Sequence, residues 1–274
     1  MDQRRVIKSI FGVDRALIGA IHVGGLPGTP SHDRSLATIV DTAVAEARLY
    51  AAAGFHGLVM ENTHDRPYLK GAVGPEIVAS LAVIGKEIRR AVPSAPLGVQ
   101  ILAGANQAAL AVALACGASF VRVEGFVFAH VADEGLIEAS AAALLRYRRA
   151  IGAEGIRVFG DIKKKHSAHA LTADVSLVET AKAAEFFLVD GVIVSGIATG
   201  QPTDANEVRS VAAAVGVPVL VGSGVTSGNV RDYDAADALI VGSDVKRDGL
   251  WSGPLDEART RALVKAFDKR ASDS

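Results

Sequence analysis

The fold is decided by the stretch Val219-Leu-Val-Gly222-Ser223-Gly224-Val225-Thr226 and by its later counterpart Leu239-Ile-Val-Gly242-Ser243-Asp244. Each is a short apolar run, rich in β-branched residues, that breaks at Gly-Ser, which is typical of a buried strand ending in an open turn. Glycine has no Cβ, so the amide groups of such turns can approach a phosphate closely. The two turns predict a phosphate cup made by Gly222, Ser223, Gly224, Gly242 and Ser243. Asp244 argues against a bulky anion at the second turn and would contact a sugar hydroxyl or hold a lysine.

Working outward, apolar runs of similar length alternate with longer Ala-rich segments of helical period, which is typical of βα units and a parallel sheet. The predicted strands are 16–21, 57–61, 97–102, 119–124, 156–162, 191–195, 217–222 and 237–242. The predicted helices are 36–53, 75–91, 106–116, 136–151, 175–187, 204–215, 230–234 and 255–269. The seventh helix is very short, as expected where a barrel builds its phosphate site.

A faint repeat indicates that the sheet closes. Even-numbered strands follow similar entries, such as Ala53-Gly-Phe-His-Gly and Cys116-Gly-Ala-Ser-Phe, whereas the third and seventh follow a proline. An open doubly wound sheet would need a G-x-G-x-x-G turn after its first strand, and the segment 24–28 lacks it. We therefore predict an α/β fold, a single (β/α)8 TIM barrel of the ribulose-phosphate-binding type, with residues 1–274 as one domain.

The composition limits the classes of binding partner and the cellular location that we expect. The chain has 29 Lys plus Arg against 30 Asp plus Glu and no strongly basic block, which argues against nucleic acid. We recognise neither a secretory signal nor an apolar run of the roughly 20 residues that cross a bilayer, so we predict no membrane insertion. One cysteine allows no internal disulfide, which fits a reducing compartment, and we expect a cytoplasmic location. A homo-oligomer is an expectation from base rates alone.

Working residues of such barrels stand at the C-terminal strand ends. These positions hold a ring of polar side chains that a purely structural barrel does not need, because buried charge costs several kcal/mol unless it is paired. Besides the cup and Asp244, the ring comprises His22, Glu61, Asn62, Gln100, Glu124, Asp161, Lys163, Lys165, His166 and Ser195.

The ring suggests several roles. Glu61 and Glu124 could act as general acid and base, hold a divalent cation with Asp161, or simply pair with neighbouring basic residues. Because side chains alternate along a strand, Asp161, Lys163 and Lys165 should share one face, where a lysine could form a Schiff base or neutralise a ligand.

The remaining groups are less decisive. Lys164 should be a solvated surface charge, and His22 is as compatible with a structural role as with a catalytic one. No zincin, C-x-x-C or Walker motif occurs. No cofactor is therefore indicated with certainty, although a divalent metal is compatible with the carboxylates.

The chain also resembles the BtpA/SgcQ family, named for a photosystem I biogenesis protein and a sugar-operon protein. The blocks that carry the resemblance span most of the chain: residues 17–28, 57–62 with Pro67, 161–166, 195–200, 222–226 and 241–251. The family's usual loop has two prolines where this chain has Gly24-Gly25, so the substrate pocket is expected to differ in detail. The resemblance implies a TIM barrel and an enzymatic character, without naming a reaction.

Three functions follow as expectations. The first is an enzyme acting on a phosphorylated small molecule, a sugar phosphate or a nucleotide-derived compound, by isomerase, epimerase or lyase chemistry. The second is a non-catalytic assembly or stability factor of the photosystem I biogenesis type, which predicts a collapsed barrel mouth. The third is a metal-dependent hydrolase that uses the carboxylates.

Overall fold

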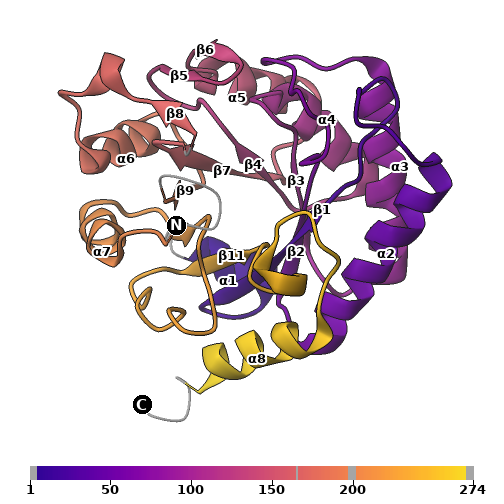
Figure 1. The fold of residues 1–274 in the computed structure, drawn as a ribbon. Coiled ribbons are helices and arrows are strands. Elements are labelled where there is room, and N and C mark those ends of the chain that lie inside the picture. The colour runs from indigo at the N-terminus through magenta and orange to yellow at the C-terminus, as the bar shows by residue number, and fades with distance from the viewer. Residues whose placement is uncertain (1–4, 165, 197–201, 270–274) are drawn as a thin grey trace.

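Eight parallel strands close into a barrel in a computed structural model, which describes residues 5–164, 166–196 and 202–269 (Figure 1). Around the barrel the order is β1-β11-β10-β9-β7-β4-β3-β2. The strands are β1 (Ala16–His22), β2 (Gly57–Glu61), β3 (Leu97–Gln100), β4 (Phe120–Val123), β7 (Arg157–Ile162), β9 (Gly191–Val194), β10 (Val219–Val221) and β11 (Ala238–Val241). All eight predicted strands are present and the predicted barrel is confirmed, with strand ends that differ from the predicted ones by at most two residues.

Helices cover the outside of the barrel (Figure 1). Three have the predicted bounds: α2 (Leu36–Ala53), α3 (Pro75–Ala91) and α4 (Asn106–Cys116). The others are α5 (Ala141–Ala150), α6 (Leu177–Phe186), α7 (Ala205–Ala214) and α8 (Glu257–Asp268). Their ends follow local chemistry: Ser176 and Glu179 form a capping box at the start of α6, and Gly54, in the left-handed region, ends α2.

Two helix predictions are wrong. The segment predicted as helix 230–234 is a series of turns, so β10 passes to β11 without a helix. The helix predicted at 136–151 starts only at Ala141, because Gly135–Ile137 forms a strand, β6. That strand pairs with β5 (His130–Ala132), which in turn pairs with β8 (Ser167–Ala168). This three-stranded sheet joins the loop after β4 to the loop after β7.

The barrel interior is filled by side chains at alternate strand positions. Ile18, Val59, Phe120, Phe159 and Ile193 belong to one buried cluster, together with Leu220, Ala238 and Ile240. The short helix α1 (Arg5–Phe11), which was not predicted, adds Ile7 and Phe11 to this cluster and so closes the N-terminal end of the barrel. The polar residues at the C-terminal strand ends lie at the other, C-terminal end of the barrel.

No helix in the described residues is both long and apolar enough to span a membrane. The assignment of residues 1–274 to one domain and the homo-oligomer stay predictions.

Candidate active site

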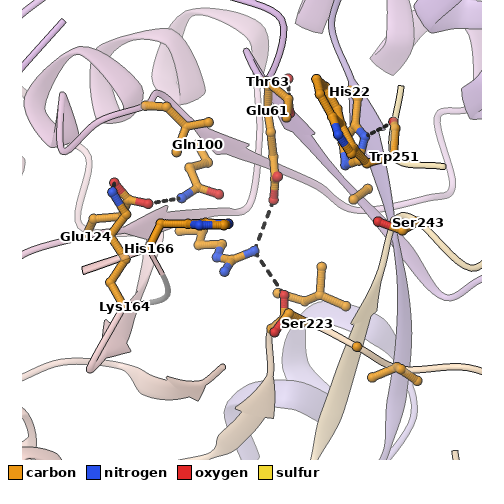
Figure 2. A pocket seen from close by; sticks show the side chains of 18 of the residues that line it. His22, Glu61, Thr63, Gln100, Glu124, Lys164, His166, Ser223, Ser243 and Trp251 are labelled. Carbon is orange, nitrogen blue, oxygen red and sulfur yellow. Dashed lines mark hydrogen bonds and ion pairs between the residues drawn. The ribbon is translucent and has the colours of Figure 1, made fainter. Parts of the chain in front are cut away.

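A cavity of about 440 Å³ opens at the C-terminal end of the barrel (Figure 2). Its walls come from the strand ends and from the loops after β2, β4, β7, β10 and β11. The predicted residues that line it are His22, Glu61, Gln100, Glu124, His166, Gly222, Ser223, Gly224, Gly242, Ser243 and Asp244. Further side chains line the cavity that were not predicted to do so, among them Thr63, Tyr68, Arg122, Asp133, Glu134, Lys164 and Trp251.

Arg122 is the centre of the polar ring. Its Nε and Nη2 donate to the two carboxylate oxygens of Asp161 at 2.7 and 2.9 Å, and its Nη1 donates to Glu61 Oε1 at 3.2 Å. The side chains of Arg122 and Asp161 are 5% and 2% exposed, so both charges are removed from water and depend on each other. Burial lowers the pKa of Arg122, but the carboxylates of Asp161 and Glu61 outweigh burial and raise it well above its usual value. The guanidinium is therefore permanently charged.

The ion pair with Arg122 changes the roles expected for Asp161 and Ser195. Ser195 Oγ donates to Asp161 Oδ1 at 3.0 Å, so the Asp161 carboxylate is fully engaged, and within the described chain neither residue lines the mouth cavity. Asp161 therefore orients Arg122 rather than meeting a ligand. The described residues contain no group of three or more His, Cys, Asp or Glu side chains placed to hold a metal ion. Glu61 and Asp161 surround the Arg122 guanidinium, and a divalent metal stays a possibility from the sequence that this geometry does not test.

Glu124 has the most unusual environment of the ring. Gln100 Nε2 donates to its Oε1 at 3.3 Å, and Lys164 Nζ lies 3.3 Å from its Oε2. Burial raises the pKa of Glu124 to about 7, although the Lys164 ammonium group lowers it. A carboxyl group whose pKa lies near neutrality can both accept and donate a proton.

Lys164, and not Lys163, reaches the cavity. Its side chain is only 10% exposed, which contradicts the prediction of a solvated surface charge. The cause is local backbone geometry: β7 ends at Ile162, and Lys163 has φ 52°, so strand alternation stops before the lysines. Lys163 lies instead beside a separate small cavity with His130 and His169. Lys165 lies outside the described residues.

The predicted phosphate cup forms one side of the cavity. Gly224 has φ 68°, a conformation that favours glycine, and Asn229 Nδ2 donates to its carbonyl at 2.8 Å. Ser223 Oγ accepts from the Gly196 amide, so this hydroxyl helps to hold the loop. Among the described residues we find no acceptor for the amides of Gly224 and Ser243. Within the described part of the chain, these two N–H groups therefore have no protein acceptor and can donate to an anion.

Asp244, beside the cup, is engaged with protein groups. Its Oδ1 lies 3.2 Å from Arg259 Nη2, and its Oδ2 accepts from the Ser227 amide at 3.3 Å. Of the two predicted contacts, a lysine or a sugar hydroxyl, a basic residue is present, but it is an arginine from α8.

His22 and Trp251 form the wall nearest the second glycine turn (Figure 2). The His22 Nδ1 atom lies 2.8 Å from the Trp251 carbonyl oxygen, so Nδ1 carries the proton of the neutral ring. The Trp251 ring is flanked by His64, at 4.9 Å between ring centroids, and by the Arg66 guanidinium, 5.0 Å from its centroid. These contacts hold the loop after β11 over the cavity.

Asn62 does not line the cavity. Its Nδ2 donates to Asp65 Oδ2 at 3.0 Å and its Oδ1 accepts from the Leu102 amide at 2.7 Å. Asp65 in turn accepts from the Leu26 amide at 2.7 Å. Both ends of the Asn62 amide therefore fasten loops to one another, and its predicted contact with substrate is not supported by this geometry.

Some of the missed residues had a sequence signal. Arg122 lies two positions before Glu124 on the same strand, so alternation alone predicts that both side chains point inward. Glu134 and Trp251 had no such signal, because both lie in irregular loops whose path depends on tertiary contacts.

Comparison with known proteins identifies the family of this chain. The family model for the BtpA family matches residues 13–269. The chain belongs to the BtpA family. Among its relatives, a Caenorhabditis elegans protein whose name marks it as mitochondrial is 46% identical over 97% of this chain and 98% of its own. The photosystem I biogenesis protein BtpA of Synechocystis is 33% identical over 94% of this chain and 89% of its own. The cytoplasmic location stays a prediction for this family member.

Solved structures agree on the fold. Thiamine phosphate pyrophosphorylase from Pyrococcus furiosus has a TM-score of 0.58 and is 15% identical, covering 93% of this chain and 96% of its own. Phosphoribosyl anthranilate isomerase from Thermus thermophilus has a TM-score of 0.57 and is 15% identical, covering 94% of this chain and 100% of its own. At this identity the likeness shows a shared barrel.

Proposed function

We propose that this BtpA-family barrel is an enzyme that binds a phosphorylated small molecule in its mouth and catalyses proton transfer with Glu124. The observation that carries the proposal is the position of a buried carboxyl group of pKa about 7 in the same cavity as two glycine-rich turns. Figure 2 shows Glu124 and Lys164 on one side of the cavity and Ser223 and Ser243 on the other. A ligand anchored by its phosphate would present its reacting carbon between them.

The proposed division of labour follows from charge. The amides of Gly224 and Ser243 supply donors to the phosphate, and the Arg122 guanidinium supplies a fixed positive charge at the base of the cavity. Glu124 removes and returns a proton, and the Lys164 ammonium stabilises the oxyanion that forms when the proton leaves a carbon next to a carbonyl. This chemistry fits an isomerase, an epimerase or a lyase.

Three further observations support this function over the alternatives. The names of both structural neighbours refer to phosphorylated compounds, thiamine phosphate and phosphoribosyl anthranilate. A non-catalytic assembly factor would not require an open mouth, whereas the cavity here measures about 440 Å³. A hydrolase that holds its metal between Glu61 and Asp161 would first have to displace Arg122 from both carboxylates.

Binding is tested by calorimetry with sugar phosphates, nucleoside monophosphates and their unphosphorylated counterparts. We expect at least one phosphorylated compound to bind, and its counterpart to bind at least about a hundredfold more weakly, because several charge-assisted hydrogen bonds are lost. Ser243→Asp places a negative charge in the cup and should abolish this binding. Ser210→Asp, on the exposed surface of α7, is the matched control. Equal binding by Ser243→Asp and the wild type would refute the cup.

Proton transfer is tested without knowing the product. A compound that binds is incubated with the enzyme in heavy water, and deuterium incorporation at carbon is followed by NMR. The wild type should exchange a proton next to the carbonyl group, and Glu124→Gln should bind the compound but exchange it at least about a hundredfold more slowly. Undiminished exchange in Glu124→Gln would exclude Glu124 as the base.

A further inference from the structure

Two buried carboxylate oxygens line the end of the cavity away from the cup. Glu124 Oε2 and Glu134 Oε2 have no partner among the described residues apart from the Lys164 ammonium group, and their side chains are only 6% and 8% exposed. Lys164 Nζ is their shared neighbour, at 3.3 Å from the first and 3.7 Å from the second. Leaving a buried acceptor without a donor costs about 1–3 kcal/mol, and more for a charged one. One ammonium group is thus the partner of two buried carboxylate oxygens, and each of them can accept a further hydrogen bond.

The fold brings this pair together by an insertion in the barrel. Glu134 lies in the turn between β5 and β6, a hairpin placed after β4. The hairpin is held by β8, which pairs with β5 and begins three residues after Lys164. The same small sheet thus positions Glu134 and Lys164 beside Glu124, which comes from the end of β4. A barrel without the hairpin would have Glu124 but no second acceptor.

The charges indicate which donors fit. One ammonium group faces two carboxyl groups, so the cluster is already partly neutralised, and the described residues hold no group of three or more side chains placed to bind a metal ion. Hydroxyl groups are neutral donors that can satisfy carboxylate oxygens with strong O–H···O⁻ bonds. Two neighbouring hydroxyls on one ligand would supply one donor to each glutamate.

We propose that Glu124 and Glu134 bind neighbouring hydroxyl groups of the substrate, which is therefore a phosphorylated polyhydroxy compound held by its phosphate at one end and by its hydroxyls at the other. This inference rests on the proposed function and adds the substrate class. Glu134 acts here as a specificity-determining residue, while Glu124 also exchanges the proton.

Two linear ligands separate the two ends of the site. Ribitol 5-phosphate and pentyl phosphate have equal chain lengths and the same phosphate but differ in hydroxyl groups, and inorganic phosphate probes the cup alone. We expect Glu134→Gln to weaken the binding of ribitol 5-phosphate about tenfold, because one hydrogen bond to a charged group contributes about that much to affinity. Binding of pentyl phosphate and of inorganic phosphate should stay within about twofold. Glu138→Gln makes the same change on an exposed residue past the hairpin and should alter none of them.

The outcomes are distinct. A similar loss for ribitol 5-phosphate and pentyl phosphate in Glu134→Gln, or unchanged binding of ribitol 5-phosphate, overturns the hydroxyl site and leaves the phosphate cup intact. If the wild type binds none of the three phosphates or the wider panel, the proposed function itself fails. Glu134→Ala, with thermal unfolding as a check on folding, gives a second reading should Glu134→Gln be unstable.

Discussion

Arg122 and Asp161 form a two-pronged ion pair in the barrel, with Nε and Nη2 of the guanidinium 2.7 and 2.9 Å from the two carboxylate oxygens. The two residues are 39 positions apart in the chain and on neighbouring strands, β4 and β7. Glu61 from β2 approaches the same guanidinium. Arg122 therefore neutralises both buried carboxylates at the base of the cavity, and its contribution to stability can be measured.

Removing Arg122 should destabilise the protein strongly. Arg122→Met leaves Asp161 and Glu61 buried without their cation, which we expect to lower the free energy of unfolding by about 3–5 kcal/mol. Chemical denaturation measures this. Arg149→Met, which breaks an exposed pair with Glu154, should cost less than about 1 kcal/mol. If both variants lose the same small amount, the buried pair does not hold the barrel as described.

Stability should fall as pH rises through the range in which Glu124 ionises. Its pKa is about 7 in the folded protein against an ordinary value of 4.5, so the folded state binds the extra proton between these values. The unfolding free energy therefore decreases from about pH 5 to about pH 7 on account of this group. Glu124→Gln should flatten this part of the profile, measured by denaturation at a series of pH values. Glu154→Gln, at an exposed position, should follow the wild type.

Trp251 should report ligand binding. It is the only tryptophan of the chain and lines the cavity between His22 and His64, so a ligand in the mouth changes its surroundings. We expect ribitol 5-phosphate to shift or quench the intrinsic fluorescence with the same Kd that calorimetry gives. Trp251→Phe should lose the signal while heat of binding persists. Calorimetric binding with unchanged fluorescence would place the ligand outside the mouth.

The barrel interior should not accept a methyl group at Gly98. A Cβ at this position would overlap the Phe120 ring, which fills the interior from the neighbouring strand. We expect Gly98→Ala to lower the free energy of unfolding by about 1–3 kcal/mol through overpacking, as measured by thermal or chemical denaturation. Gly155→Ala is the matched control, because a Cβ there meets no atom within 4 Å. Equal stability of the two variants would mean that Phe120 can move away at no cost.

The amino-acid sequence by itself determined the barrel, the two glycine turns and most of the inward-facing ring. These features depend on short-range pattern: β-branched runs between amphipathic helices, Gly-Ser at strand ends, and period-two alternation. The alternation of side chains along the fourth predicted strand places Arg122 on the same inward face as Phe120 and Glu124, so the missed arginine could have been predicted. Of the two helices predicted wrongly, one failed because a few residues of helical composition were used in a strand, where pairing with β5 outweighed local propensity.

The tertiary structure alone decided which polar groups meet. Barrel closure brings together Glu61 from β2, Arg122 from β4 and Asp161 from β7, and no local pattern specifies these pairs. A single left-handed residue, Lys163, turns Lys164 into the cavity, and the β5–β6 hairpin carries Glu134 to it. Loops lack the periodic hydrogen bonds and side-chain patterns by which strands and helices are predicted from sequence. Their paths therefore depend on long-range packing.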